Sequence, residues 1–140
     1  MLDAYVEAGG NFIDTADVYS RWYPGNKGGE SETIIGTWLK KNPAKRDKVQ
    51  IATKCGMDMP NVGQGLSAAH IKRSVEDSLK RLNTDRIDLF QSHRDDKTTP
   101  QEETLATYGE LVKAGKLRFI GASNFEAPRL AEAAKIAKEK

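Results

Sequence analysis

Residues 49–54, Val49-Gln50-Ile51-Ala52-Thr53-Lys54, are the clearest indication of the fold class, because they have the length and β-branched content of a buried strand. Runs of the same kind begin at residues 11, 87 and 117, so the four starts are 38, 38 and 30 residues apart. Segments with helical periodicity fill the gaps. Strands that alternate with helices in this way predict a parallel sheet with right-handed crossovers.

The helix with the clearest periodicity follows Ser67, which we expect to be its N-cap. Its apolar stripe recurs at i, i+4, i+8 and i+11: Ile71, Val75, Leu79 and Leu82. Thr99-Pro100-Gln101-Glu102 predicts the start of the next helix as a capping box with proline at the first helical position. The basic cluster at residues 45–48 is expected to be a solvated loop.

The length of the chain limits the possible architectures. A complete (β/α)₈ barrel needs about 250 residues, or roughly 31 per unit, so 140 residues correspond to about four and a half units. We predict an α/β chain that forms a partial (β/α)₈ TIM barrel of about four parallel β/α units, as a single domain over residues 1–140. The alternative is a small doubly wound sheet, which roughly 140 residues would complete.

Composition excludes several classes of function. The 22 basic and 20 acidic side chains leave a net charge of +2, which gives no argument for a nucleic-acid or membrane partner. No run of 18 apolar residues is present, and the first residues lack the basic and apolar regions of a secretion signal. The single cysteine, Cys55, excludes an internal disulfide and a multi-thiolate metal site. We therefore expect a cytoplasmic protein.

Polar residues stand at the carboxyl ends of the four predicted strands: Asp14, Lys54, His93 and the pair Ser123-Asn124. In parallel α/β folds, functional sites are built at this edge of the sheet. Taken singly, each residue has a structural alternative. Asp14 is typical of a turn, Lys54 of a lysine that extends to water, and His93 of a hydrogen-bonded structural histidine. Taken together, they predict one site.

Tyr19 suggests what reaction this group of residues could perform, because its phenol can donate a proton. The structural alternative is that Tyr19 packs at the edge of the core, which is also typical of a tyrosine after a strand. A phenol is a poor proton donor at neutral pH, and a nearby cation stabilises its phenolate form. We expect Lys54 to supply the cation and Asp14 to hold Lys54 in place. With His93 donating a hydrogen bond to a carbonyl oxygen, the group predicts a general-acid site that protonates this oxygen as a hydride reaches the carbon.

These residues lie in segments that resemble motifs of the aldo-keto reductase family. Asp14-Thr15-Ala16-Asp17-Val18-Tyr19 resembles the D-T-A-x-x-Y segment, and Ile51-Ala52-Thr53-Lys54 resembles the strand with the catalytic lysine. Leu89-Phe90-Gln91-Ser92-His93-Arg94 resembles the strand that ends in the catalytic histidine, and Gly121-Ala122-Ser123-Asn124-Phe125 resembles the G-x-S-N-F segment. The resemblance implies a (β/α)₈ barrel and NADPH-dependent reduction of an aldehyde or ketone, with NADH as the alternative cofactor.

The resemblance also implies a role for each residue. Tyr19 is the proton donor, Lys54 and Asp14 tune it, and His93 orients the carbonyl. Ser123 and Asn124 hold the carboxamide of the nicotinamide, and Asp14 also contributes to the cofactor site.

The matching segments run from the family's first barrel helix to the helix after its fifth strand, and the absent units carry most cofactor contacts. One hypothesis is therefore that the chain is a fragment of a reductase and that this fragment is inactive by itself. The other hypothesis is that the chain is a non-catalytic half barrel, which self-associates through its open sheet edges.

Overall fold

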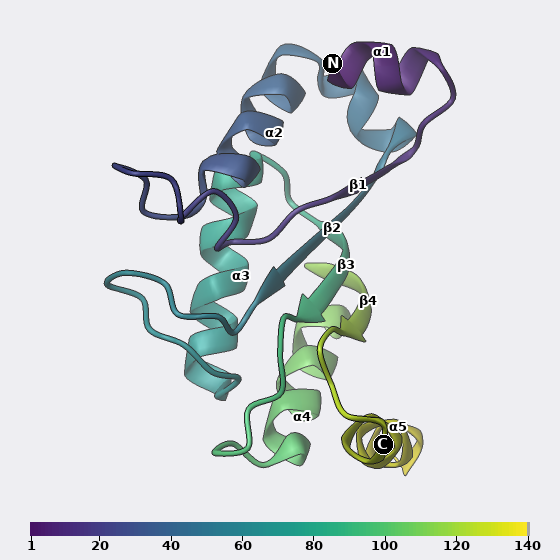
Figure 1. Cartoon of the computed structure of the whole chain (residues 1–140). Coiled ribbons are helices and arrows are strands. Elements are labelled where there is room, and N and C mark those ends of the chain that lie inside the picture. The colour runs from purple at the N-terminus through teal and green to yellow at the C-terminus, as the bar shows by residue number, and fades with distance from the viewer. Residues whose placement is uncertain (140) are drawn as a thin grey trace.

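In the computed structural model, which describes residues 1–139, four parallel strands form one sheet in the order β1-β2-β3-β4 (Figure 1). The strands are β1 (Phe12–Asp14), β2 (Gln50–Cys55), β3 (Ile87–Ser92) and β4 (Leu117–Ala122). The helices are α1 (Leu2–Glu7), α2 (Glu30–Lys41), α3 (Ala68–Leu82), α4 (Gln101–Lys113) and α5 (Ala127–Glu139), with a 3₁₀ turn at Pro43–Lys48. None of these helices is long and apolar enough to cross a bilayer.

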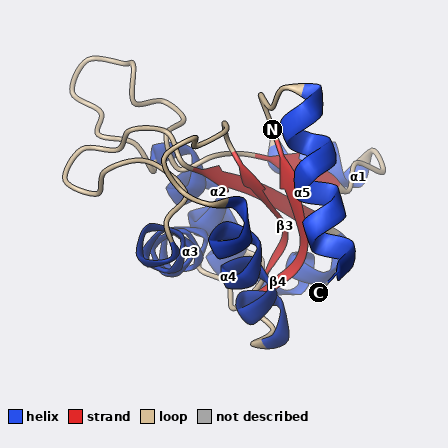
Figure 2. Ribbon diagram, turned by 90° about the horizontal axis from the view of Figure 1, so that it is seen from below, coloured by secondary structure: helices blue, strands red, loops and turns tan. Residues whose placement is uncertain are grey.

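The strand order decides between the two architectures that the length allows. Each strand pairs in parallel with the strand before it in the sequence, so every right-handed crossover leaves its helix on the same face of the sheet. Figure 2 shows α2, α3 and α4 along this face. A doubly wound sheet changes direction and carries helices on both faces. The fold is therefore α/β and consistent with a partial (β/α)₈ barrel, as predicted.

The hydrophobic core lies between the sheet and the helices that cover it. Ile51 and Phe90 are fully buried on the covered face, and Phe90 packs edge-to-face on Tyr108 of α4 with ring centroids 6.0 Å apart. The predicted stripe of α3 is buried in the same core, and Ser67 caps this helix by accepting a hydrogen bond from the His70 N–H. Burial of these apolar side chains is the main source of stability for the sheet–helix interface.

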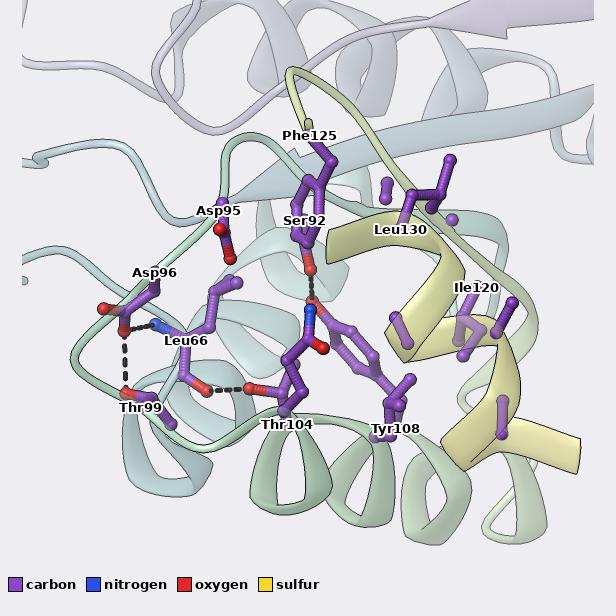
Figure 3. A pocket seen from close by; sticks show the side chains of 17 residues that line it. Leu66, Ser92, Asp95, Asp96, Thr99, Thr104, Tyr108, Ile120, Phe125 and Leu130 are labelled. Carbon is purple, nitrogen blue, oxygen red and sulfur yellow. Dashed lines mark hydrogen bonds between the residues drawn. The ribbon is translucent and has the colours of Figure 1, made fainter. Parts of the chain in front are cut away.

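The capping box predicted at Thr99 is wrong. Helix α4 begins at Gln101, and its N-cap is Pro100, without a side-chain capping hydrogen bond. The Thr99 hydroxyl instead donates to Asp96 Oδ2 at 2.7 Å, and the Leu66 N–H donates to the same oxygen at 2.8 Å. Asp96 therefore accepts hydrogen bonds from two loops, and the Thr99 side chain stabilises the loop before α4 instead of capping the helix (Figure 3).

The basic cluster predicted as a solvated loop also has a different role. Its Arg46 is buried and forms an ion pair with Asp88 of β3, with Nη2 and Oδ2 2.7 Å apart. The Ile51 N–H donates to the same carboxylate at 2.9 Å. Burial acts to raise the pKa of Asp88, but these hydrogen bonds to its ionised form outweigh burial and lower the pKa. The 3₁₀ turn is thereby fixed to the amino-terminal end of the sheet.

The other face of the sheet is uncovered. It carries Phe12 of β1 and Phe119 of β4, whose side chains remain 44% and 69% exposed. Within residues 1–139, no strand pairs with the outer edge of β1 or of β4. The sheet therefore presents two open edges and an uncovered face with exposed aromatic side chains, which are the surfaces that a closed barrel would bury.

Candidate active site

Lys54 occupies the centre of the site at the carboxyl end of β2. Asp14 of β1 pairs in register with Ala52, and side chains two residues apart on a strand share a face, so Asp14 and Lys54 meet on the uncovered face. Lys54 Nζ lies 2.8 Å from both carboxylate oxygens of Asp14 and donates to the Thr15 carbonyl oxygen, also at 2.8 Å. Lys54 is only 6% exposed, so this ion pair is shielded from water on the lysine side.

Tyr19 reaches the same ammonium group from the loop between β1 and α2. Its hydroxyl oxygen accepts a hydrogen bond from Lys54 Nζ at 3.1 Å, and Nζ lies 4.8 Å from the centre of the phenol ring. Trp22, in the same loop and largely exposed, lies edge-to-face against Tyr19 with ring centroids 6.2 Å apart. The ammonium group thus lies between a carboxylate and a phenol, as the sequence predicted.

The backbone of Asp17 fixes this loop on the sheet. Its N–H donates to the Lys54 carbonyl oxygen at 3.1 Å, and its own carbonyl accepts from the Gly29 N–H at 2.6 Å. Gly29 is the N-cap of α2 and has a φ of 86°, a left-handed conformation that favours glycine. The loop that carries Tyr19 is therefore held at both ends.

His93 follows β3 and completes the group. Its backbone N–H donates to the Cys55 carbonyl oxygen at 2.8 Å, and its ring lies edge-to-face to Tyr19 with centroids 5.8 Å apart. Burial lowers the pKa of the imidazole, and the Lys54 charge lowers it further. His93 is therefore neutral at pH 7 and has a single ring N–H to donate. Nδ1 is buried and has no hydrogen-bond partner among residues 1–139, which leaves Nε2 for a substrate.

Ser123 and Asn124 lie beside His93 at the same edge of the sheet. The Asn124 side-chain amide donates to the His93 carbonyl oxygen at 2.8 Å and to Ser123 Oγ at 3.1 Å. Asn124 has a φ of 56°, a left-handed conformation in which asparagine is favoured over most other residues. All six predicted site residues are thus brought to one edge, although Asn124 is hydrogen-bonded to the backbone of His93 and Ser123 to that of Ser92, and not to the Tyr19–Lys54 pair.

Sequence reasoning missed a buried ion pair beneath the site. Glu32 of α2 is fully buried; its Oε1 accepts from the Thr53 hydroxyl at 2.5 Å and its Oε2 accepts from Arg81 Nε at 2.6 Å. Thr53 is the residue before Lys54. A signal was available, because Glu32 lies three residues before Ile35 and so shares its buried stripe. This ion pair ties β2, α2 and α3 together beneath Lys54.

Asp17 belongs to the segment of residues 14–19, and no pattern in the sequence marks it as buried. It is nevertheless only 2% exposed, and its Oδ1 has no hydrogen-bond partner among residues 1–139. Burial raises the pKa of this carboxyl to about 7, and the Glu32 charge adds to the rise, while Arg81 opposes it. Asp17 and Glu32 therefore share one cation, and Asp17 retains its proton up to neutral pH.

Comparison with known sequences agrees with this geometry. The sequence model of the Aldo/keto reductase family matches residues 1–140, which is the whole chain. The chain belongs to the aldo/keto reductase family. Three relatives illustrate the similarity: the Bacillus subtilis proteins named uncharacterized oxidoreductase YrpG and aldo-keto reductase YhdN, at 40% and 43% identity, and the 6-dehydroglucose reductase of Novosphingobium aromaticivorans, at 37%.

These aldo/keto reductase relatives are longer than the present chain. The matches cover 95%, 89% and 94% of this chain but only 42%, 36% and 42% of YrpG, YhdN and the 6-dehydroglucose reductase. The chain therefore spans about two fifths of the length of the curated relatives that it matches.

Proposed function

We propose that this chain supplies the catalytic centre of an NADP(H)-dependent oxidoreductase that reduces aldehyde or ketone carbonyls to alcohols. The observation that carries the proposal is the position of Lys54 Nζ, which contacts both carboxylate oxygens of Asp14 and the hydroxyl of Tyr19. A buried ammonium group held in this way stabilises the anion that remains when the phenol gives up its proton.

Each of the four residues has a distinct part in the proposed reaction. Tyr19 donates its hydroxyl proton to the carbonyl oxygen of the substrate, and Lys54 stabilises the phenolate left behind. Asp14 fixes the ammonium group through two contacts. His93, neutral at pH 7, donates a hydrogen bond from its one N–H and orients the carbonyl.

The residues next to His93 suit the carboxamide of a nicotinamide ring. Asn124 uses its amide N–H groups on the His93 carbonyl and on Ser123, while no residue among 1–139 donates to its Oδ1. This leaves an amide oxygen and a serine hydroxyl as a donor–acceptor pair for a carboxamide. We infer that Ser123 and Asn124, with Asp14, hold the nicotinamide end of NADPH or NADH. When bound, the cofactor supplies the hydride.

We further propose that residues 1–140 form one domain of an incomplete barrel, and that these residues expressed alone do not turn over. By family resemblance, most contacts to the pyrophosphate and adenosine belong to later barrel units, and the basic residues that choose NADPH over NADH lie there too. The expected partner is a small carbonyl substrate. The low cysteine content favours a reducing compartment, so we place the reaction in the cytoplasm.

A second candidate function is a non-catalytic half barrel that self-associates. The exposed Phe119 and the open edge of β4 favour it, because a two-fold assembly would cover both. Sedimentation of residues 1–140 distinguishes the candidates: this second function requires a stable dimer or larger species, and a monomer at all concentrations would exclude it.

A chimera tests the reductase proposal directly. Residues 1–140 replace the matching segment of the Bacillus subtilis relative that is 43% identical, so that the remaining units complete the barrel. We expect NADPH-dependent reduction of an aldehyde, and Tyr19→Phe should lower kcat by about 10²–10⁴-fold because it removes the proton donor.

Tyr23→Phe is the matched control, since Tyr23 is an exposed phenol in the same loop with no hydrogen bond from its hydroxyl to residues 1–139. It should leave kcat unchanged. An active chimera in which Tyr19→Phe is as fast as the unmodified protein would show that Tyr19 is not the donor.

A further inference from the structure

Two buried carboxyl groups share one arginine beneath the loop that carries Tyr19. Arg81 Nε donates to Glu32 Oε2 at 2.6 Å, and the Arg81 charge also acts on the Asp17 carboxyl. Glu30, a third acid near Arg81, accepts hydrogen bonds from two backbone N–H groups of the residues before it. The guanidinium can therefore neutralise one of the two buried acids, and its hydrogen bond assigns it to Glu32.

The Asp17 side chain lacks a comparable partner. Its Oδ1 is buried and accepts no hydrogen bond from residues 1–139. The titratable and charged groups that face it are Glu32 from α2, Arg81 from α3 and Cys55 from β2. Burial raises the pKa of the Cys55 thiol well above its usual value, so Cys55 stays neutral. A neutral carboxyl group is tolerated at this position, whereas a carboxylate would need further hydrogen-bond donors.

A tight turn connects Asp17 to Tyr19. The Tyr19 N–H donates to the Ala16 carbonyl oxygen at 3.3 Å, so Asp17 and Val18 are the central residues of this turn. The Asp17 N–H donates to the Lys54 carbonyl oxygen, which attaches the turn to β2. Any rearrangement of the Asp17 side chain that shifts the turn will therefore move the Tyr19 ring relative to the Lys54 ammonium group.

Arg81 contacts the second attachment point of the turn. The Asp17 carbonyl oxygen accepts a hydrogen bond from the Gly29 N–H at 2.6 Å. A Cβ on Gly29 would lie 2.6 Å from Arg81 Cδ and 2.9 Å from Arg81 Nε, so the arginine side chain packs directly on the Gly29 backbone. A movement of Arg81 from Glu32 toward an ionised Asp17 would therefore disturb the hydrogen bond that holds the turn to the start of α2.

We propose that Asp17 is a positioning residue for Tyr19: its neutral carboxyl keeps the turn closed on β2, and its ionisation moves Tyr19 away from Lys54. The ionised carboxylate either turns out to water or draws Arg81 away from Glu32, and both movements shift the turn. The proton is released to solvent. Burial, with the Glu32 charge, raises the pKa of Asp17 to about 7, while Arg81 opposes the rise, so the change falls in the neutral range. This inference rests on the proposed role of Tyr19 as the proton donor.

NMR of residues 1–140 tests the movement without any need for turnover. Labelled aspartate carboxyl carbons report the titration of Asp17. The nuclear Overhauser effect between the rings of Tyr19 and His93, whose centroids are 5.8 Å apart, reports the position of Tyr19. This effect should weaken as Asp17 ionises, with the same midpoint, and should stay constant in Asp17→Asn. A ring contact that is unchanged while Asp17 titrates, or that weakens equally in the variant, would overturn the proposal.

The same ionisation should appear in the rate of the active chimera. If the ionised form is inactive, a pKa of about 7 makes kcat about tenfold lower at about pH 8 than at about pH 6. Asp17→Asn should remove this fall. Glu32→Gln should move its midpoint to lower pH, because it removes a charge that disfavours the ionisation of Asp17. Asp85→Asn, at an exposed acid just before β3, is the control and should keep the profile of the unmodified protein.

The two experiments separate this inference from the function on which it rests. An inactive chimera would contradict the reductase proposal, while the contact between the two rings would still decide the role of Asp17. An active chimera with the same alkaline fall in Asp17→Asn would show that Asp17 does not position Tyr19, and would leave Tyr19 as the proton donor. The ring contact in the unmodified chain decides the question even if Asp17→Asn does not fold.

Discussion

Replacement of Asp17 by asparagine should make the protein more stable at neutral and alkaline pH. Burial, with the Glu32 charge, raises the pKa of Asp17 in the folded protein to about 7, against 3.8 in the unfolded chain. Between these values the folded state binds one proton more than the unfolded state, so the free energy of unfolding falls as the pH rises. A difference of about 3 pKa units corresponds to about 4 kcal/mol, all of which is lost above about pH 7 and none below about pH 3.8.

The asparagine variant lacks this titration, and its advantage over the unmodified protein should therefore depend on pH. From the two pKa values, the difference in unfolding free energy between variant and unmodified protein should be about 3 kcal/mol larger at about pH 8 than at about pH 5. Any constant effect of the new amide cancels in this comparison. Urea unfolding followed by circular dichroism at both pH values measures it.

Asp85→Asn is the matched control, since the Asp85 side chain is 89% exposed, and its effect should be the same at both pH values. If Asp17→Asn also changes stability equally at both pH values, Asp17 does not hold a proton in the folded protein and the reasoning is refuted.

Three further predictions concern the helix packing and the site. Arg81→Met should cost about 3–5 kcal/mol of unfolding free energy, because it leaves the buried Glu32 carboxylate without its cation, and thermal unfolding would show this. Gly36→Ala should lower the free energy of unfolding by about 3 kcal/mol, because a Cβ at this position would clash with the Arg81 carbonyl oxygen. Gly109→Ala is the control: a Cβ there meets nothing within 4 Å, so this variant should be as stable as the unmodified protein or more stable in the same thermal unfolding experiment. In the active chimera, the acid limb of kcat/KM due to His93 should lie below pH 6.5, the usual pKa of histidine, and a limb above it would contradict the assigned environment.

Local sequence signals were sufficient for the elements that position the site. β2 begins one residue later than predicted, and α3 occupies the predicted segment with its predicted cap, because both have strong hydrophobic patterns. The clustering of Asp14, Lys54 and His93 followed from a topological rule, that parallel strands end at one edge. Tyr19, by contrast, lies in a loop, and its place in the site was predicted from chemistry and resemblance.

The ion pairs that depend on how the helices pack could not be predicted from the sequence. Glu32 and Arg81 are 49 residues apart, and Arg46 and Asp88 are 42 apart, so no local spacing connects them. Thr99 matched a capping box, but the loop offered its hydroxyl a better acceptor in Asp96. In each case, a tertiary contact determined the role of a polar side chain whose local pattern allowed several.

The order of the strands has a consequence for synthesis on the ribosome. Each strand pairs only with its predecessor, so the paired residues are 30 to 38 positions apart, and no contact in the sheet has to wait for a distant segment. Sheets with such short sequence separations close small loops at each step, which favours rapid and sequential folding. The ion pair between Asp14 and Lys54 can therefore form as soon as β2 has emerged, before β3 and β4 join the sheet.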